Sequence, residues 1–142
     1  MNKEVRVFAP ATVANVAVGY DILGFAINRP GDEIVARFNP ELKGLKITAI
    51  TGTGNKVLPF DVELNTAGVA AQRLLEHLGK TDVGIELEVH KKMPFGSGLG
   101  SSAASSAGAV GAVNELLGAR LSRESLLYFS VLGEVVGGGS FL

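Results

Sequence analysis

The stretch with the clearest chemical potential begins at residue 93 and reads MPFGSGLGSSAASSAGAV. It holds three glycines at alternate positions, followed by two adjacent serines: Gly96, Gly98, Gly100, Ser101 and Ser102. Glycine admits positive φ, so backbone N–H groups can converge on an anion. The helix expected after the glycines adds free N–H groups and the positive end of its dipole. This pattern favours a phosphate-binding loop over a flexible linker.

The side chains next to the glycines have matching chemistry. Lys91 and Lys92 precede the loop and could supply positive charge. Ser101 and Ser102 fall at the expected helix start, where a hydroxyl can cap the helix, bind a phosphate oxygen or reach Mg²⁺. The glycines alone leave a tight loop with a serine N-cap as an alternative. The pattern is neither a Walker A loop, since no lysine follows Gly100, nor the Rossmann fingerprint, since the glycine spacing differs.

Composition narrows the class of protein. The chain has 142 residues, a net charge of −1 and 46% hydrophobic residues, which fits a single domain of residues 1–142. There are no cysteines, which excludes thiolate chemistry, and His77 and His90 stand alone, so we assign them no metal. The near-neutral net charge does not favour nucleic-acid binding, and no apolar run is long enough to span a membrane. We therefore expect a cytoplasmic protein that binds neither nucleic acid nor membrane.

Four strands are predicted from alternating apolar residues, over 4–9, 32–38, 44–50 and 83–89. The third of these strands is expected around Leu45, Ile47 and Ala49. A helix is predicted from the segment NTAGVAAQRLLEHLGK, with Asn65 as N-cap and Gly79 just past its end. Another is predicted over 101–117, ended by Gly118, and a last one over 123–135, capped by Ser122. Strands early and helices on one sheet predict an α+β fold.

The glycine-rich stretch closely resembles the phosphate-binding motif of the GHMP kinases, P-x-G-x-G-L-G-S-S-A. These are ATP-dependent kinases that act on small molecules such as galactose, homoserine and mevalonate. The matching residues are Pro94, Gly96, Gly98, Leu99, Gly100, Ser101, Ser102 and Ala103. The resemblance implies a two-layer α/β sandwich, the N-terminal domain of that fold, with a left-handed β-α-β crossover.

A second segment, FAPATVANVAVGYDILGFAI, is similar to the N-terminal motif of the homoserine kinases within this family. The segment that begins at Asn65 is similar to their helix near the adenine. Ala17 departs from the motif, because glycine is common there. The matching residues of the N-terminal motif are Pro10, Ala11, Thr12, Ala14, Asn15, Gly19, Tyr20, Asp21 and Gly24.

The resemblance implies a role for each matched residue. Asn15 and Asp21 would bind the amino-acid substrate, with the Asp21 carboxylate paired to its ammonium group. Glu134 and the loop serine Ser101 would bind Mg²⁺. ATP would be bound by Asn65, Lys91, Pro94, Gly96, Ser97, Gly98, Leu99, Gly100, Ser101, Ser102 and Ala103. Simpler roles stay open. Asp21 could cap a turn, and Asn15 could bond the backbone of its own loop. Asn65 could be only an N-cap, and Glu134 could be a solvated helix residue.

The resemblance implies ATP-dependent phosphorylation of L-homoserine to O-phospho-L-homoserine, a step of threonine biosynthesis, by a homodimer in the full-length form. It assigns no general base. The family's proteins are much longer, and GEVVGGGSFL stops inside a homoserine kinase motif, so we expect a truncated N-terminal domain. Alternatives are another GHMP kinase, a half-kinase that pairs with a second chain, and a non-catalytic module on RNA. The near-neutral charge and 6% aromatic content speak against RNA.

Overall fold

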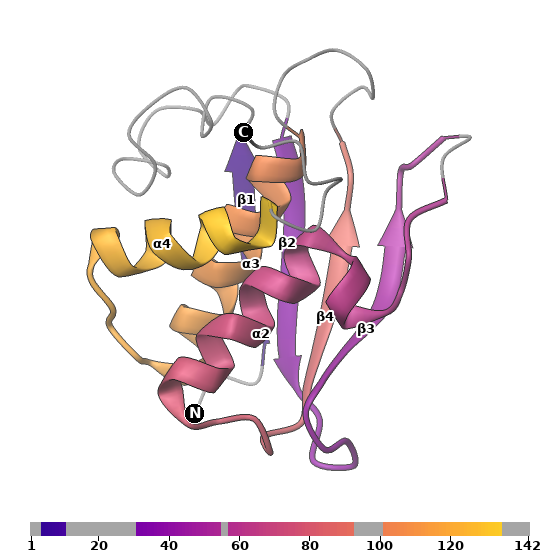
Figure 1. Ribbon diagram of the computed structural model, residues 1–142. Helices are drawn as coiled ribbons and strands as arrows, with labels where there is room; N and C mark the ends of the chain where they lie inside the picture. Colours follow the sequence, from indigo (N-terminus) through magenta and orange to yellow (C-terminus); the bar gives the residue numbers. More distant parts are fainter. Residues whose placement is uncertain (1–3, 11–30, 55–56, 93–100, 135–142) are drawn as a thin grey trace.

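The computed structural model describes residues 4–10, 31–54, 57–92 and 101–134 (Figure 1). The strands of this part are β1 (Glu4–Pro10), β2 (Gly31–Phe38), β3 (Leu45–Thr51) and β4 (Ile85–His90). The helices are the 3₁₀ turn η2 (Val62–Leu64), α2 (Thr66–Leu78), α3 (Ser101–Leu117) and α4 (Arg123–Glu134). Among these helices, none has the length and hydrophobicity that crossing a bilayer requires.

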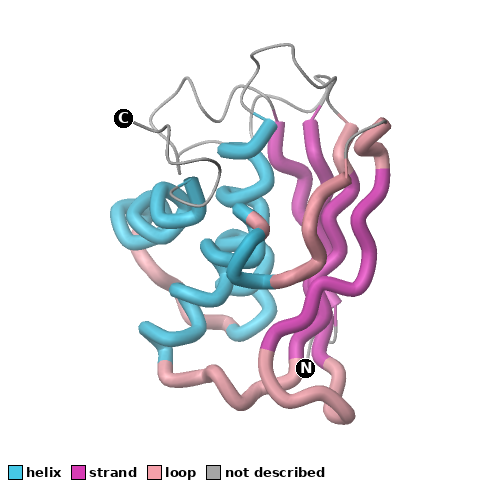
Figure 2. Tube along the Cα trace, turned by 45° about the vertical axis from the view of Figure 1, so that its right-hand side comes forward, coloured by secondary structure: helices cyan, strands magenta, loops and turns pink. Residues whose placement is uncertain are grey.

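The strands form one mixed sheet in the order β1-β2-β4-β3, and the helices cover one of its faces (Figures 1 and 2). β2 pairs antiparallel with both β1 and β4, whereas β3 and β4 are parallel neighbours joined through α2. Figure 1 shows the sheet from its helical side with β3 and β4 pointing up. The chain leaves β3, passes in front of the sheet through α2, and enters β4 on the left of β3. This is a left-handed crossover, and the α+β prediction is confirmed.

The period-two pattern predicts the buried face of β2 and β4, and it fails for part of β3. Leu87 and Val89 of β4 are buried as expected. In β3 the register shifts between Ile47 and Ala49, so that Ile50 rather than Ala49 pairs with Val89. Ile50 packs against the core. Strict alternation would place Ala49 inward after Ile47, and the irregularity reverses this alternation.

The predicted helix ends are confirmed by their capping contacts. Asn65 accepts a hydrogen bond from the Gly68 N–H at 3.1 Å, and Gly79 follows α2 with φ 67°. Gly118 ends α3 with φ 64°. The Ser122 hydroxyl accepts a hydrogen bond from the Ser125 N–H at 3.1 Å at the start of α4. These caps satisfy backbone groups that a helix leaves unpaired at its ends.

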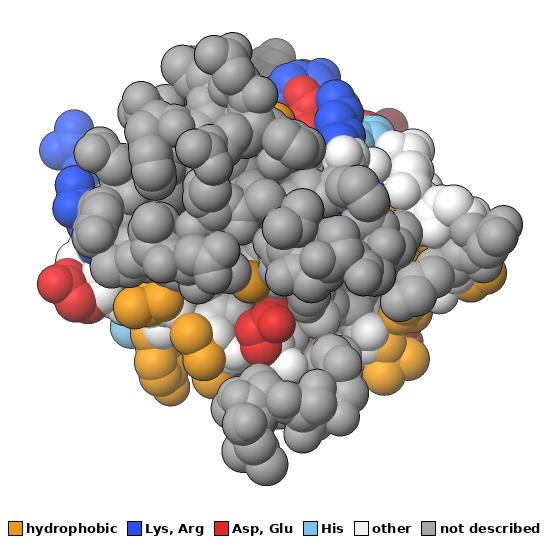
Figure 3. All heavy atoms as spheres, turned by 90° about the horizontal axis from the view of Figure 1, so that it is seen from above, with side chains coloured by type: hydrophobic (Ala, Val, Ile, Leu, Met, Phe, Trp, Pro, Cys, Tyr) orange, Lys and Arg blue, Asp and Glu red, His pale blue; other side chains and the backbone are white. Residues whose placement is uncertain are grey.

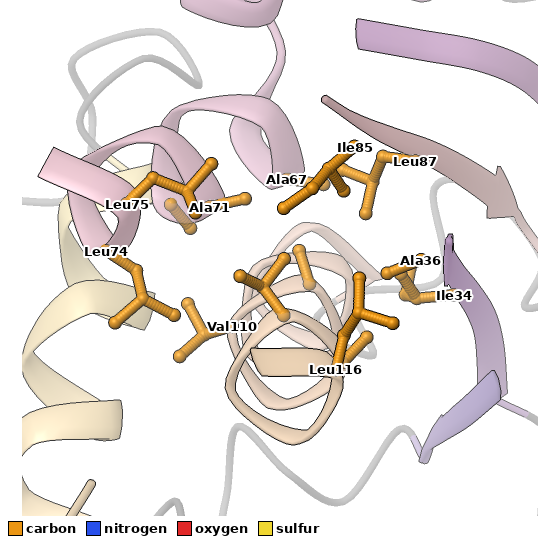
Figure 4. Packing of buried hydrophobic residues seen from close by; sticks show 14 of the residues in the cluster. Ile34, Ala36, Ala67, Ala71, Leu74, Leu75, Ile85, Leu87, Val110 and Leu116 are labelled. Carbon is orange, nitrogen blue, oxygen red and sulfur yellow. The ribbon is translucent and has the colours of Figure 1, made fainter. Parts of the chain in front are cut away.

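α3 packs against the sheet and against both other helices, and the core is built around it. Figure 4 shows side chains of α2, β2 and β4 converging on this helix, Leu74 and Ile34 among them. Small residues on α3 let the sheet come close. A Cβ atom on Gly108 would lie 2.6 Å from Ile34 Cγ1 and 3.2 Å from Ala9 Cβ. The glycine therefore sets the distance between α3 and the strands β1 and β2.

Charged side chains line the face of the sheet that points away from the helices. Arg37 pairs with Glu4 at 3.1 Å, with Glu86 at 3.2 Å and with Glu88. Val35 lies on the same face and is fully buried. The hydrogen bond from Arg37 holds the pKa of Glu88 below its usual value. Seen from above, charged side chains and a histidine gather along the margin that this face forms (Figure 3).

Candidate functional site

Several chain segments meet at one end of the sheet. β1 ends there and β2 begins, because Pro10 pairs with Gly31. β4 ends beside them, since His90 pairs with Glu33, and Thr51 at the end of β3 pairs with His90. α3 begins at this end and α4 terminates near it (Figure 1). Of the predicted site residues that the structure describes, Ser101 begins α3 at this end and Glu134 ends α4 near it.

Most of the predicted site residues lie outside the described residues. Ser101 and Ser102 form the first turn of α3, as predicted, and Ala103 follows them. Residues 93–100 connect β4 to this turn, so the described chain flanks them on both sides. The predicted residues that the structure does not describe are Asn15, Asp21, Pro94, Gly96, Ser97, Gly98, Leu99 and Gly100.

Residues on both sides of the segment 93–100 take part in one buried polar network. The Lys91 ammonium donates to Asp32 Oδ2 at 2.9 Å and to Ser105 Oγ at 2.6 Å. The Ser105 hydroxyl donates to Asp32 Oδ2 at 2.9 Å, and the Lys92 backbone N–H donates to Asp32 Oδ1 at 3.1 Å. The Lys91 and Asp32 side chains are 5% and 0% exposed. That Lys91 binds nucleotide stays a prediction, and the described contacts of its ammonium are with Asp32 and Ser105.

Sequence reasoning missed Asp32 and Ser105, although one signal was present for Asp32. Asp32 lies in phase with Ile34 and Ala36 on β2, so alternation points it into the same face as the core residues. Lys91 continues the inward phase of Leu87 and Val89 in the same way. Two opposite charges in the buried phase of adjacent strands indicate a buried pair.

Glu134 is the last residue of α4 and lies beside α3. The Ser106 hydroxyl is 3.3 Å from Glu134 Oε2 and 3.4 Å from the Thr66 carbonyl oxygen at the start of α2. Gly133 makes this approach possible. A Cβ atom there would lie 2.5 Å from both Ser106 Oγ and the Thr66 carbonyl oxygen. The half-buried carboxylate of Glu134 is thus held near the first turn of α2 and the second turn of α3.

Asn65 uses both ends of its amide in the structure. Oδ1 caps α2, and Nδ2 donates to the Pro59 carbonyl oxygen at 2.9 Å. Asn65 is 6% exposed. Its role as N-cap is confirmed, and its contact with a nucleotide base stays a prediction.

Glu134 is the described carboxylate that was predicted to hold Mg²⁺. Within the described ranges, no three His, Cys, Asp or Glu side chains group together as metal ligands would. Mg²⁺ usually keeps waters and takes one or two carboxylates together with substrate phosphates. Glu134, half-buried beside α3, is compatible with such a site.

The chain belongs to the GHMP kinase family, because residues 65–140 match the model of the GHMP kinases N-terminal domain. Curated relatives that match the chain include homoserine kinases, a narrower group than the family as a whole. A homoserine kinase from Chlorobium phaeobacteroides is 47% identical along 97% of this chain, and one from Methanococcus vannielii is 42% identical along 97%. The aligned part is 45% of each relative, so the chain spans a little under half the length of these proteins.

Comparison with solved structures points to the same family. The crystal structure of homoserine kinase from Cytophaga hutchinsonii has a TM-score of 0.81 and 46% identity, over 99% of this chain and 44% of that one. The mevalonate kinase of Methanococcus jannaschii has a TM-score of 0.54 and 17% identity over 96% of this chain and 45% of that one. The second likeness shows that the fold is shared, and nothing about substrate.

Proposed function

We propose that the protein to which this chain belongs transfers the γ-phosphoryl group of ATP to the side-chain hydroxyl of L-homoserine. The product would be O-phospho-L-homoserine, used in threonine biosynthesis. The observation that carries this proposal is identity of 42–47% to homoserine kinases along nearly the whole chain. Because the chain spans 45% of those relatives, the activity is assigned to the full gene product.

The geometry supports a phosphate site at the start of α3. Free N–H groups of its first turn and the positive end of its dipole stabilise an anion there. Residues 93–100 lead directly into this turn, and their glycines permit the backbone to wrap phosphate oxygens. In the proposed reaction the bond from the γ-phosphorus to its bridging oxygen breaks. A bond to the homoserine oxygen forms, and the hydroxyl proton is released to solvent.

The remaining roles follow the same assignment. Glu134 and Ser101 would hold Mg²⁺, which neutralises phosphate charge when bound. Asn65 would lie beside the base, and Asn15 and Asp21 would bind homoserine. Positioning and charge stabilisation carry most phosphoryl-transfer catalysis, so no general base is assigned. We further propose a cytoplasmic homodimer that acts on a small molecule.

The test is ADP release by the full gene product with MgATP and a panel of alcohols. We expect kcat/KM for L-homoserine to exceed that for mevalonate and galactose by about a hundredfold or more. Phosphorus NMR should identify a phosphate ester on the homoserine side chain. Equal or higher activity on another alcohol would assign a different GHMP kinase. RNA binding that weakens steeply with salt, without MgATP binding, would reject the kinase assignment.

A further inference from the structure

The Asp32 carboxylate connects the two described ends between which residues 93–100 run. On the strand side, Asp32 Oδ1 accepts the Lys92 backbone N–H at 3.1 Å. On the helix side, Asp32 Oδ2 accepts the Ser105 hydroxyl at 2.9 Å. Lys91 bonds both partners, Asp32 at 2.9 Å and Ser105 at 2.6 Å. The start of β2, the end of β4 and the first turns of α3 are thus held at one buried point.

Complete burial makes this point rigid. Asp32 is fully buried, Ser105 is 2% exposed and Lys91 is 7% exposed. Charges so far from water persist only when they are paired and hydrogen-bonded, so a shift of one partner leaves another unsatisfied. A buried pair of this kind is weak evidence for stability, and its best-attested use is to select one arrangement of the elements. The network therefore fixes where α3 starts relative to the end of β4.

We infer that Asp32 and Ser105 are positioning residues for nucleotide phosphate binding. They set the separation and direction of the strand end and helix start that flank residues 93–100. Neither residue is assigned a contact with substrate. This inference rests on the proposed function, because it assumes that phosphate is bound at the start of α3.

The test compares Ser105→Ala and Asp32→Asn with Ser130→Ala in the full gene product. Ser130 is a matched control, since it is a buried serine whose hydroxyl bonds the Leu126 carbonyl oxygen within its own helix. We expect the dissociation constant for ADP to rise about tenfold in the first two variants, as one hydrogen bond to a charged group implies. The constant for AMP and the KM for homoserine should change less than about twofold, within ordinary scatter for an uninvolved contact. Ser130→Ala should leave all three unchanged.

Asp32→Asn leaves the buried Lys91 ammonium without its counter-ion and is the variant most prone to misfolding. Ser105→Ala keeps both charges of the pair and leaves Lys91 in place, so it keeps the inference testable if Asp32→Asn does not fold. Folded variants with wild-type ADP affinity would overturn the inference. So would equal losses for ADP, AMP and homoserine that follow the drop in Tm, since that result indicates a purely structural role. A wild-type protein that binds no ADP would overturn the proposed function, and the inference with it.

Discussion

At the scale of single residues, two adjacent serines of α3 have different partners. Ser105 bonds Asp32 on the sheet, whereas Ser106 lies against Thr66 and Glu134 in the helical layer. Successive residues of an α-helix point about 100° apart, so neighbours in sequence can serve opposite layers. These two hydroxyls therefore bond different layers from neighbouring positions of one helix.

Glu134 is the residue on which the proposed magnesium site depends. Glu134→Gln keeps the shape of the side chain and an oxygen near Ser106, but it removes the negative charge. We expect kcat/KM of the full gene product to fall about a hundredfold and the Mg²⁺ concentration for half-maximal activity to rise. The measurement is initial rate as a function of Mg²⁺ at saturating ATP.

Glu124→Gln is the matched control for this prediction. Glu124 lies in the first turn of the same helix and is exposed. It should retain wild-type rates and magnesium dependence. If Glu134→Gln behaves like this control, Glu134 is a solvated helix residue and the magnesium assignment is wrong.

At the scale of elements, the sequence predicts helix ends well and strand detail less well. Asn65, Gly79 and Ser122 act locally, through caps and positive φ, so their pattern is visible in a few neighbouring residues. The irregularity near Thr48 in β3 is different. It depends on pairing with β4, far along the chain, and local alternation alone would have placed Ala49 inward.

The same distinction applies to the candidate site. Asp32 and Lys91 could have been found from their phase in adjacent strands, because alternation identifies the buried face. Ser105 and Ser106 could not have been found in this way. Small residues occur on every side of α3, so no single apolar stripe marks the side of the helix that meets the sheet. Residues 93–100 were recognised by their motif, and their contacts stay predictions.

Two glycines of α3 test how closely the layers pack. A Cβ atom on Gly108 would lie 2.6 Å from Ile34 Cγ1, whereas one on Gly111 would meet nothing within 4 Å. We expect Gly108→Ala to lower the free energy of unfolding by about 1–3 kcal/mol through overpacking. Gly111→Ala should raise it by about 0.5–1 kcal/mol through helix propensity.

Urea unfolding of the full gene product, followed by circular dichroism, measures both changes. The two substitutions are chemically identical and differ only in what the new methyl group meets. Equal effects from both would contradict the close contact of α3 with β2. A stabilising Gly108→Ala would show that this part of the sheet has room to move.

At the scale of the whole molecule, the charged face of the sheet makes stability depend on pH. The pKa of Glu88 is lowered by the hydrogen bond from Arg37 and then by the one from His90. Burial raises the pKa of Glu33, but hydrogen bonds from Arg6 and Lys92 outweigh it, so this pKa is lowered as well. A lowered carboxyl pKa stabilises the fold above the unfolded value, about 4.3, and this contribution is lost as pH falls below it.

Glu88→Gln should therefore make the free energy of unfolding less dependent on pH in the acidic range. We expect a loss of about 0.5 kcal/mol at pH 7, the usual size for a partly exposed ion pair, and almost none well below pH 4. Urea midpoints at several pH values between 7 and 3 measure the difference between variant and wild type. A difference that stays constant over this range would show that Glu88 contributes through packing rather than charge.

The small side chains of α3 also have a consequence for the entropy of folding. Alanine and glycine lose no rotamer freedom when they are buried. α3 carries Ala104, Ala107, Ala109 and Ala112 at buried positions, so much of the helix at the centre of the fold is ordered without that cost. What it loses is mostly backbone freedom, which its glycines increase. Its thermodynamic balance thus depends on how closely backbones approach more than on the size of the side chains between them.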